Sequence, residues 1–321
     1  MNYLKTNCII CNRAFNHKII WILFDEKNVI ECQNCKHKSV FPRPSNYEIG
    51  AINIGMYKDN VFSVDKKKEN WAKDSIKIYN RYINKYSEGN EIFKLLDIGG
   101  GLGYYSKAFQ DVGFDVTTIE MDSISSEFAE KKLGVNKVFK GSVEEFDLTS
   151  AIQFDIIFCR HLIEHFENPE ILIKKCKKLL NPGGLLIIET DNNRSIELLL
   201  NYDSRNFYIS LYKKILYEYN FFKLLINPIF AIDPPRHIHS FNSRNLQELV
   251  RNNGLNIKKT FSYSLGSKLW PNIPNSKIRH LYINKLGSRK KDLYNILFTP
   301  LRVVLNIFGF GAGIFLIAKN N

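Results

Sequence analysis

Four cysteines are spaced as the ligands of a metal ion. Cys8 and Cys11 form one C-x2-C pair, Cys32 and Cys35 form a second, and 20 residues separate the two pairs. Two such pairs supply the four thiolates that tetrahedral Zn²⁺ needs, with each pair in a knuckle and a hairpin between them. Because thiolates fill all four positions, the predicted zinc is structural and takes no part in catalysis.

The remaining two cysteines, Cys159 and Cys176, lie in apolar or amphipathic runs and are predicted to be buried thiols. With the other four reserved for metal, the reducing cytoplasm is the favoured compartment. Residues 1–10 also lack the apolar core of a signal peptide. His17 and His37, although close to the cysteines in sequence, are expected to be bystanders.

A glycine-rich loop with acidic neighbours follows an apolar run. The pattern D-x-G-x-G-x-G extends from Asp97 to Gly103, and Glu120 ends the next apolar run. Glycines let a backbone turn tightly and approach a ligand closely, and Glu120 is placed to accept hydrogen bonds from ribose hydroxyls. A carboxylate beside the loop would repel a pyrophosphate but suits an ammonium or sulfonium group. The pattern therefore argues against NAD and favours S-adenosylmethionine.

These groups need a scaffold that alternates strands with helices. Between the strands, the apolar spacing predicts helices at 104–112, up to 132, at 169–180 and at 243–253, the last with Ser243 as its N-cap. Strands that alternate with helices of this length form a parallel sheet covered on both faces, so the fold class is α/β. The predicted strands are 92–98, 115–119, 138–139, 154–159, 185–189, 255–261 and 313–319.

The sequence resembles the class I S-adenosylmethionine-dependent methyltransferases over about residues 91–192, and more loosely over 235–262. Besides the glycine loop, the most specific stretch is 154–192. It contains F-D-x-I at the end of a strand, the pair Glu164-His165, and then L-x-P-G-G from Leu180 to Gly184. The resemblance implies a Rossmann-like methyltransferase sheet with S-adenosylmethionine as the cofactor.

The resemblance also implies which residues contact the cofactor. It places Asp97, Gly99, Gly101 and Gly103 at the methionine end of the cofactor. It places Glu120 at the ribose, and Met121, Ser142 and Val143 at the adenine. Arg160 and His161 are expected to line the methyl-transfer pocket.

The catalytic candidates are two histidines. His237 lies in a P-x-H-x-x-x-F segment that resembles the one before the last helix of these methyltransferases, and it is the candidate base. In relatives that methylate sugar carbon a Glu-His pair stands there. Arg236 replaces the Glu here, which favours O-methylation. His165 is expected to organise the pocket wall. Arg236 and Arg244 are candidates to bind a substrate phosphate, with a solvated basic face as the open alternative.

The charge distribution separates the middle of the chain from its flanks. Lys and Arg number 45 and Asp and Glu 32, a net charge of +13. Residues 91–193 are nevertheless acidic, and the segments on both sides are basic. This pattern argues against a protein that coats nucleic acid with a uniformly basic surface. It favours one site for a cation and a second surface for an anion.

The chain is expected to divide into three parts: a zinc-ribbon-like module at 1–45, a helical linker at 46–90, and a methyltransferase domain at 91–321 with a helical lid insertion at about 194–240. The apolar run 303–318 is short and broken by glycines, so we expect a helix, a turn and a closing strand there and no transmembrane segment. A peripheral membrane contact through 215–232 stays open.

The ribbon loosely resembles that of zinc-bearing bacterial methyltransferases acting on sugar nucleotides or surface-polysaccharide components, as do Phe41-Pro42-Arg43-Pro44 and Tyr57-Lys58-Asp59-Asn60. The sequence therefore predicts a cytoplasmic O-methyltransferase for a small anionic acceptor, such as a phosphorylated sugar. Two alternatives stay open: an RNA or protein methyltransferase guided by the ribbon, and a non-catalytic docking subunit. Nucleic acid is disfavoured because the ribbon has few interleaved aromatic and basic residues.

Overall fold

The structure is a computed structural model, and it describes residues 3–24, 26–44, 63–87, 93–146, 152–234, 236–263 and 289–321. The chain divides into two compact units. The first consists of Met1–Arg43, Thr190–Leu246 and Phe261–Phe315, and the second of Pro44–Glu189, Gln247–Thr260 and Leu316–Asn321.

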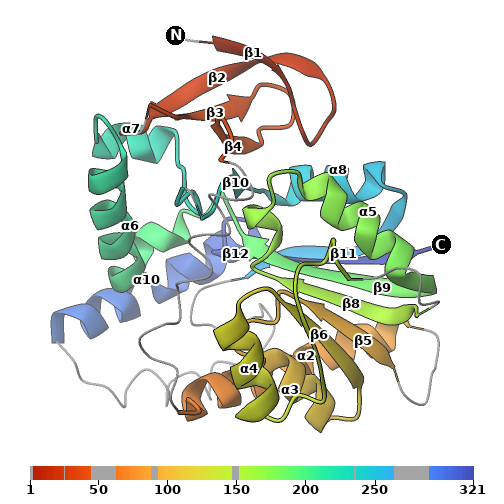
Figure 1. The fold of residues 1–321 in the computed structure, drawn as a ribbon. Helices are drawn as coiled ribbons and strands as arrows, with labels where there is room; N and C mark the ends of the chain where they lie inside the picture. The colour runs from red at the N-terminus through yellow and green to blue at the C-terminus, as the bar shows by residue number, and fades with distance from the viewer. Residues whose placement is uncertain are drawn as a thin grey trace. The chain divides into compact units, whose positions relative to one another are not determined.

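A seven-stranded sheet, in the order β11-β12-β9-β8-β5-β6-β7, is the frame of the second unit (Figure 1). The strands from β5 to β9 pair in parallel. Their apolar side chains, such as Leu96 and Ile157, are fully buried, as expected for a sheet covered on both faces. The strands are β5 (Lys94–Ile98), β6 (Asp115–Glu120), β7 (Lys137–Lys140), β8 (Phe154–Arg160), β9 (Leu180–Asp191), β11 (Leu255–Tyr263) and β12 (Gly313–Asn320).

Helices lie on both faces of this sheet. Figure 1 shows α5 and α8 on one face and α2 and α3 on the other. Side chains cap several of them at the N-terminus. Asp65 is the N-cap of α2, Asp122 that of α4, and Asn168 that of α5. The helices are α2 (Lys66–Tyr86), α3 (Tyr104–Asp111), α4 (Ser123–Lys131), the single turn η1 (Ile163–His165), α5 (Pro169–Leu179) and α8 (Ser243–Asn252).

The α/β fold class is confirmed, and most predicted elements agree with the structure within two residues. Two details were wrong. The fifth strand begins at Leu180, which pairs with Phe154 of β8. The register shifts after this pair and resumes at Leu185 opposite Ile156, so the Pro-Gly-Gly stretch lies inside β9 as an irregularity. The N-cap of α8 is Asn242, whose Oδ1 accepts the N–H groups of Arg244 and Asn245, so Ser243 is already helical.

The first unit contains an antiparallel five-stranded sheet in the order β1-β2-β3-β4-β10. β2 and β3 form the hairpin predicted between the cysteine pairs. The fifth strand comes from a segment about two hundred residues downstream, where a strand was not predicted. The strands are β1 (Tyr3–Asn7), β2 (Ala14–Ile22), β3 (Asn28–Cys32), β4 (Lys38–Phe41) and β10 (His239–Ser240).

The first unit also contains helices on either side of β10 in the sequence. They are η2 (Glu197–Leu200), α6 (Tyr202–Ile215), α7 (Phe221–Ile226) and α10 (Arg289–Ile307). Beyond α10 the chain turns and enters β12, so the apolar run 303–318 has the predicted helix, turn and strand. Within the described ranges, no helix has the length and apolar character needed to cross a membrane.

The predicted division at residues 45 and 90 stays a prediction, because compactness does not show which part of a chain folds on its own. Much of the predicted linker, including Tyr57-Lys58-Asp59-Asn60, lies outside the described residues.

Candidate functional site

The glycine loop is fixed against the second strand of the parallel sheet. The backbone N–H groups of Gly99 and Gly100 both donate to the carbonyl of Ile119, at 2.9 and 3.1 Å. Gly103 has φ +80°, and a Cβ there would lie 2.6 Å from the Cβ of Ala129. Gly101 has φ +54°, and a Cβ there would meet nothing within 4 Å. Packing therefore requires glycine at 103, whereas the space beside residue 101 is open to a ligand.

Glu120 lies at the end of β6, with its carboxylate next to the loop. One oxygen accepts the N–H of Gly101 at 2.7 Å, and the other accepts the N–H of Asp122 at 2.8 Å. Burial raises the pKa of Glu120 above its ordinary value. A carboxylate has about four acceptor positions, so these two bonds leave acceptor capacity that hydroxyl groups of a ligand could use.

Asp97 is the last acidic residue before the loop, and its side chain is buried. The hydroxyl of Ser106 donates to Oδ2 at 2.5 Å. Burial raises the pKa of Asp97 to about 7 despite this hydrogen bond. A buried carboxylate in this state is stabilised in its ionised form by a nearby cation. The Asp97 side chain therefore fits a ligand that brings an ammonium or sulfonium group.

The residues predicted to contact an adenine follow β6 and β7. Met121 is 59% exposed beyond Glu120, whereas Val143 is buried. Ser142 and Glu145 bond reciprocally, because each backbone N–H donates to the other's side chain, at 2.8 and 3.2 Å. Parallel strands end at the same edge of a sheet, so these residues share an edge with the glycine loop.

A buried polar cluster lies at the ends of β8 and β9. Glu189 is fully buried, and its carboxylate accepts the hydroxyl of Tyr79 at 2.7 Å and Nε of Arg160 at 2.9 Å. The Arg160 guanidinium lies 4.5 Å from the ring centroid of Tyr105. Sequence reasoning found Arg160 but missed its contacts with Glu189 and Tyr105, and the bond between Tyr79 and Glu189. The signal for Glu189 was an acidic residue within an otherwise apolar strand.

His161 follows Arg160 in a strained backbone conformation, with φ +48°. Its N–H donates to the carbonyl of Glu189 at 2.9 Å, and its Nδ1 lies 3.3 Å from Oε1 of the buried Glu164. His165 ends the single turn η1, and its N–H donates to the carbonyl of Leu162. The structure thus orients the His161 ring at the carboxyl edge of the sheet. The pocket-wall role of His165 stays a prediction.

His237, the candidate base, belongs to the first unit. Its Nδ1 lies 4.0 Å from Oδ2 of Asp191, and its side chain is 12% exposed. Its backbone pairs with Asp233, whose carboxylate also accepts Nη2 of Arg236 at 2.7 Å. Sequence reasoning missed Asp191 and Asp233. Because Asp233 already engages the Arg236 charge, binding a substrate phosphate there requires competition with this ion pair.

The four predicted metal ligands come together in a buried cluster. Sγ of Cys8 lies 3.6 Å from that of Cys35, Sγ of Cys11 lies 3.9 Å from that of Cys32, and all four sulfurs lie within 4.8 Å of one another. These distances are too long for a disulfide. Four sulfurs bound tetrahedrally at about 2.3 Å would lie about 3.8 Å apart. The cluster therefore fits one Zn²⁺.

The backbone of the two cysteine pairs has a matching conformation. The residue after each pair, Asn12 or Lys36, has φ of 51° or 61°. Its N–H donates to the carbonyl of the first cysteine of the pair, Cys8 or Cys32, at 2.9 or 3.0 Å. Each pair is thus a tight turn that aims two sulfurs at one point. The other two cysteines are buried free thiols, as predicted.

Comparison with known families agrees with this geometry. Residues 60–260 match the family model described as a methyltransferase domain. The match covers more than half of the chain, so the chain belongs to this methyltransferase family. The predicted resemblance to the class I S-adenosylmethionine-dependent methyltransferases is thereby confirmed.

Curated relatives match part of the chain. The ubiquinone biosynthesis O-methyltransferase of Glaesserella parasuis is 35% identical over 128 residues, which are 37% of this chain and 54% of the relative. The protein of the same name from Acinetobacter baylyi is 28% identical, over 44% of this chain and 61% of the relative. The chain thus spans about half the length of the curated relatives it matches.

Among solved structures, a SAM-dependent methyltransferase from Archaeoglobus fulgidus matches 77% of this chain and 94% of its own, with a TM-score of 0.46 and 17% identity.

Proposed function

We propose that this protein transfers a methyl group from S-adenosylmethionine to an oxygen atom of a small-molecule acceptor. The observation that carries the proposal is the set of groups at the carboxyl edge of the parallel sheet. A buried Asp97, a glycine loop open at Gly101 and the Glu120 carboxylate meet there, in a chain of the methyltransferase family. The names of the curated relatives support oxygen as the methylated atom.

The residues present fit the cofactor of this family. When bound, S-adenosylmethionine supplies a methyl group on a positively charged sulfur. Asp97 would face the cationic methionine end, and its ionised form would be stabilised there. Glu120 would accept hydrogen bonds from the ribose hydroxyls with the acceptor positions that Gly101 and Asp122 leave open. Met121, Ser142 and Val143 are assigned to the adenine end on the family resemblance.

On the acceptor side, we assign the base to His237. Methyl transfer to oxygen needs alignment of the acceptor and a group that takes up the departing proton. Asp191, 4.0 Å from Nδ1 of His237, would stabilise the protonated ring. Arg160 and His161 are assigned to the methyl-transfer pocket, where the Glu189 carboxylate fixes the Arg160 side chain.

The acceptor class is the open part of this proposal. A nucleotide-linked or polysaccharide sugar was expected from the sequence, whereas the relatives are named for ubiquinone biosynthesis. An acceptor panel therefore has to contain both phenolic hydroxyl compounds and nucleotide sugars. The structural zinc is proposed on the geometry of the four cysteines.

Two measurements test the proposed function. Isothermal titration with S-adenosylhomocysteine should show binding at one site per chain, and absence of binding would refute the proposal. Intact-mass analysis of reactions with S-adenosylmethionine and the panel should then show the gain of one methyl group on a hydroxyl compound. Cofactor binding without turnover on any acceptor would favour a docking subunit. Methylation of RNA or protein would favour a macromolecular acceptor.

A further inference from the structure

The five-stranded sheet of the first unit takes its last strand, β10, from the segment that bears His237. We call residues 3–41 the cysteine module and residues 215–240 the lid segment. β10 of the lid segment pairs with β4 of the cysteine module, with His239 opposite Ser39 and Ser240 opposite Lys38. The N–H of Val40 also donates to the carbonyl of Ile238 at 2.9 Å. The residue after His237 is therefore held directly by the cysteine module.

A pair of buried histidines reinforces this junction. Nε2 of His37 lies 3.0 Å from Nδ1 of His239, and both rings pack against Phe241. His37 lies two residues after the second cysteine pair, and its carbonyl accepts the N–H of Cys32 at 2.9 Å. One residue thus belongs both to the backbone that shapes the metal knuckle and to the contact with the lid segment.

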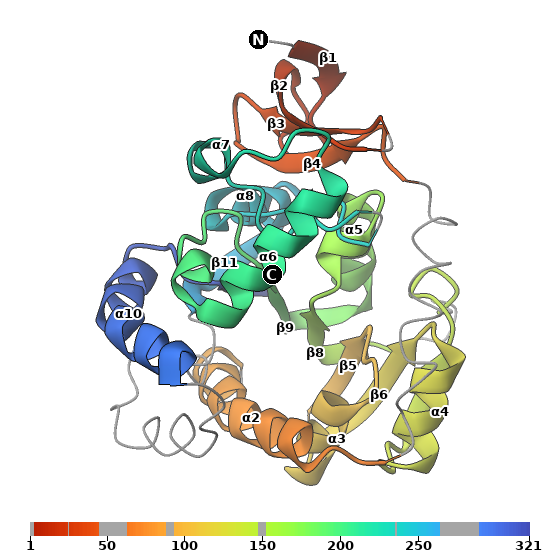
Figure 2. The same cartoon turned by 90° about the vertical axis from the view of Figure 1, so that its left-hand side faces the viewer.

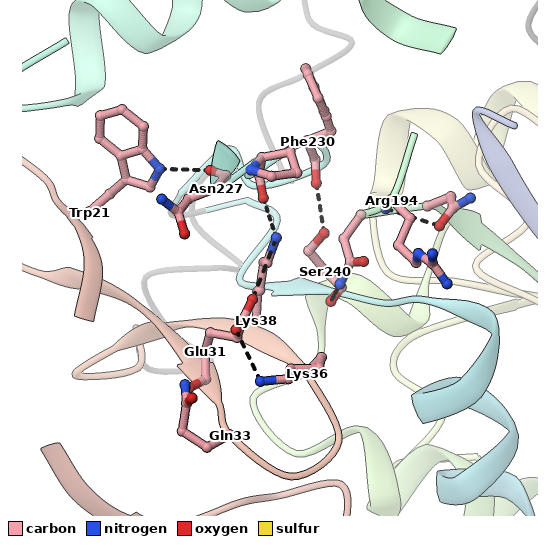
Figure 3. A network of polar contacts seen from close by, with 12 residues as sticks. Trp21, Glu31, Gln33, Lys36, Lys38, Arg194, Asn227, Phe230 and Ser240 are labelled. Atoms are coloured by element: carbon pink, nitrogen blue, oxygen red, sulfur yellow. Dashed lines mark hydrogen bonds and ion pairs between the residues drawn. The ribbon is translucent and has the colours of Figure 1, made fainter. Parts of the chain in front are cut away.

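A second junction lies in the middle of the lid segment (Figure 3). The buried Lys38 extends its ammonium group to the carbonyl of Pro228 and lies 3.8 Å from Oε2 of Glu31. Beside it, Nε1 of the buried Trp21 donates to the carbonyl of Asn227 at 3.0 Å. The cysteine module therefore satisfies two consecutive carbonyl groups of the lid segment, which an apolar surface would leave unpaired.

A third junction joins the end of the β2 hairpin to the start of the lid segment. The N–H of Phe24 donates to the carbonyl of Ile215, and the N–H of Tyr217 donates to the carbonyl of Ile22, both at 3.0 Å. Figure 2 shows α7 beside this hairpin. The lid segment is thus attached to the cysteine module at its start, in its middle and at its end.

All three junctions depend on the fold of the cysteine module, and that fold depends on the metal. A module of about forty residues buries too little apolar surface to hold its fold without a metal or a disulfide, and its cysteines are free of disulfides. In zinc modules of this kind the binding energy of the metal is folding energy. Losing the metal would therefore release β4, Lys38 and Trp21, and with them the surface on which the lid segment is ordered.

We propose that metal occupancy of the cysteine module sets the conformation of the lid segment, and through it the position of His237. Lys38 and Trp21 are positioning residues in this arrangement. The consequence for methyl transfer rests on the proposed function, because it needs His237 on the acceptor side. The conformational part stands without it. The metal then acts on the acceptor half of the reaction and leaves the cofactor-binding edge of the second unit unchanged.

Hydrogen-exchange mass spectrometry on the full chain tests the proposal. The zinc-loaded protein is compared with the same protein after chelation, with S-adenosylhomocysteine affinity measured on both. We expect at least tenfold faster exchange after chelation in peptides covering 215–217 and 227–240, and unchanged exchange over β5 and α3. Cofactor affinity should stay within twofold. Faster exchange confined to 3–41, with the lid segment still protected, would overturn the proposal.

A matched pair of variants separates the junction from the metal. Lys38 and Lys36 both lie 3.8 Å from the carboxylate of Glu31, yet the Lys36 side chain is 52% exposed and that of Lys38 is 7% exposed. We expect Lys38→Met to keep one zinc per chain while exchange at 227–232 rises at least fivefold. Lys36→Met should change neither. Equal exchange at 227–232 in the two variants would refute the positioning role of Lys38.

The same data distinguish failure of the two proposals. If the zinc-loaded protein does not bind S-adenosylhomocysteine, the proposed function fails while the exchange result stands. If cofactor binding is normal and hydrogen exchange in the lid segment is the same with and without the metal, the present inference fails and the proposed function stands.

Discussion

Tyr79 and Glu189 share a hydrogen bond of 2.7 Å at a place where both side chains are fully buried. The same carboxylate binds Arg160, which in turn lies over the ring of Tyr105. The helix α2, which precedes the glycine loop in sequence, therefore contacts the end of β9 through a specific polar group. This cluster fixes the strand end that also accepts the N–H of His161.

The Tyr79–Glu189 bond gives the first prediction. In Tyr79→Phe the buried Glu189 oxygen loses its donor, and a lost bond to a buried charged group costs about 1.5–3 kcal/mol. We expect the free energy of unfolding to fall by about that amount, measured by urea denaturation. Tyr86→Phe, on the same helix but only partly buried, is the control and should change it by less than about 0.5 kcal/mol. Equal effects of the two variants would contradict a specific role for the Tyr79 hydroxyl.

Asp97 gives a prediction of opposite sign for stability and for binding. Burial raises its pKa to about 7 from an ordinary value of 3.8. The folded, ligand-free protein therefore holds a proton that the unfolded chain releases, so stability falls as the pH rises through this window. In Asp97→Asn this fall is absent. We expect the variant to gain unfolding free energy relative to the wild type as the pH rises from about 4 to about 8, measured by denaturation at each pH.

The same substitution should weaken the cofactor complex. In the proposed function the ionised Asp97 carboxylate is the partner of the cationic amino group, and loss of such a bond costs about tenfold or more in affinity. Titration calorimetry with S-adenosylhomocysteine should show this loss at pH 8. Wild-type affinity should rise with pH through about 7, whereas the variant should show no such rise. Asp115→Asn, at a surface ion pair with Lys137, is the charge-matched control.

Two glycines of the loop are expected to differ in what a methyl group disturbs. At Gly103 an added Cβ would lie 2.6 Å from the Cβ of Ala129, whereas at Gly101 it would meet nothing within 4 Å. Both positions have positive φ, which costs an alanine about 1–2 kcal/mol. Gly103→Ala should therefore lower the Tm more than Gly101→Ala does. Relative to its fall in Tm, Gly101→Ala should show the larger fall in cofactor affinity. Melting curves with and without S-adenosylhomocysteine compare the two. An equal ratio of affinity loss to Tm loss in the two variants would argue against a ligand beside Gly101.

The sequence predicted the cofactor edge because its signals are local. Asp97, the glycines and Glu120 each lie at the end of a short apolar strand, and parallel strands end at one edge whatever the details of packing. The cysteine cluster was predictable for the same reason, since two C-x2-C turns determine the positions of their own sulfurs. The functional role of each of these residues is still a prediction.

The contacts that were missed are those between distant segments. β10 has two residues, too few to show a strand period, and it pairs with β4 about two hundred residues away. Tyr79 lies at a regular apolar position of α2, so nothing in its spacing distinguishes a hydroxyl that binds Glu189 from an ordinary aromatic core residue. The Asn242 cap was missed because Ser243 is an equally good capping residue in sequence.

The cysteine cluster gives the last prediction, on metal binding itself. Its four sulfurs are buried and lie within 4.8 Å of one another, as one tetrahedral ion requires. We expect one zinc per chain in the purified protein, and cobalt substitution should give the absorption of a tetrahedral four-thiolate site. Cys11→Ser should lower metal affinity by at least a hundredfold. Cys176→Ser removes an equally buried thiol outside the cluster and should leave metal content unchanged. Full zinc occupancy in Cys11→Ser would show that these four sulfurs are not the ligands.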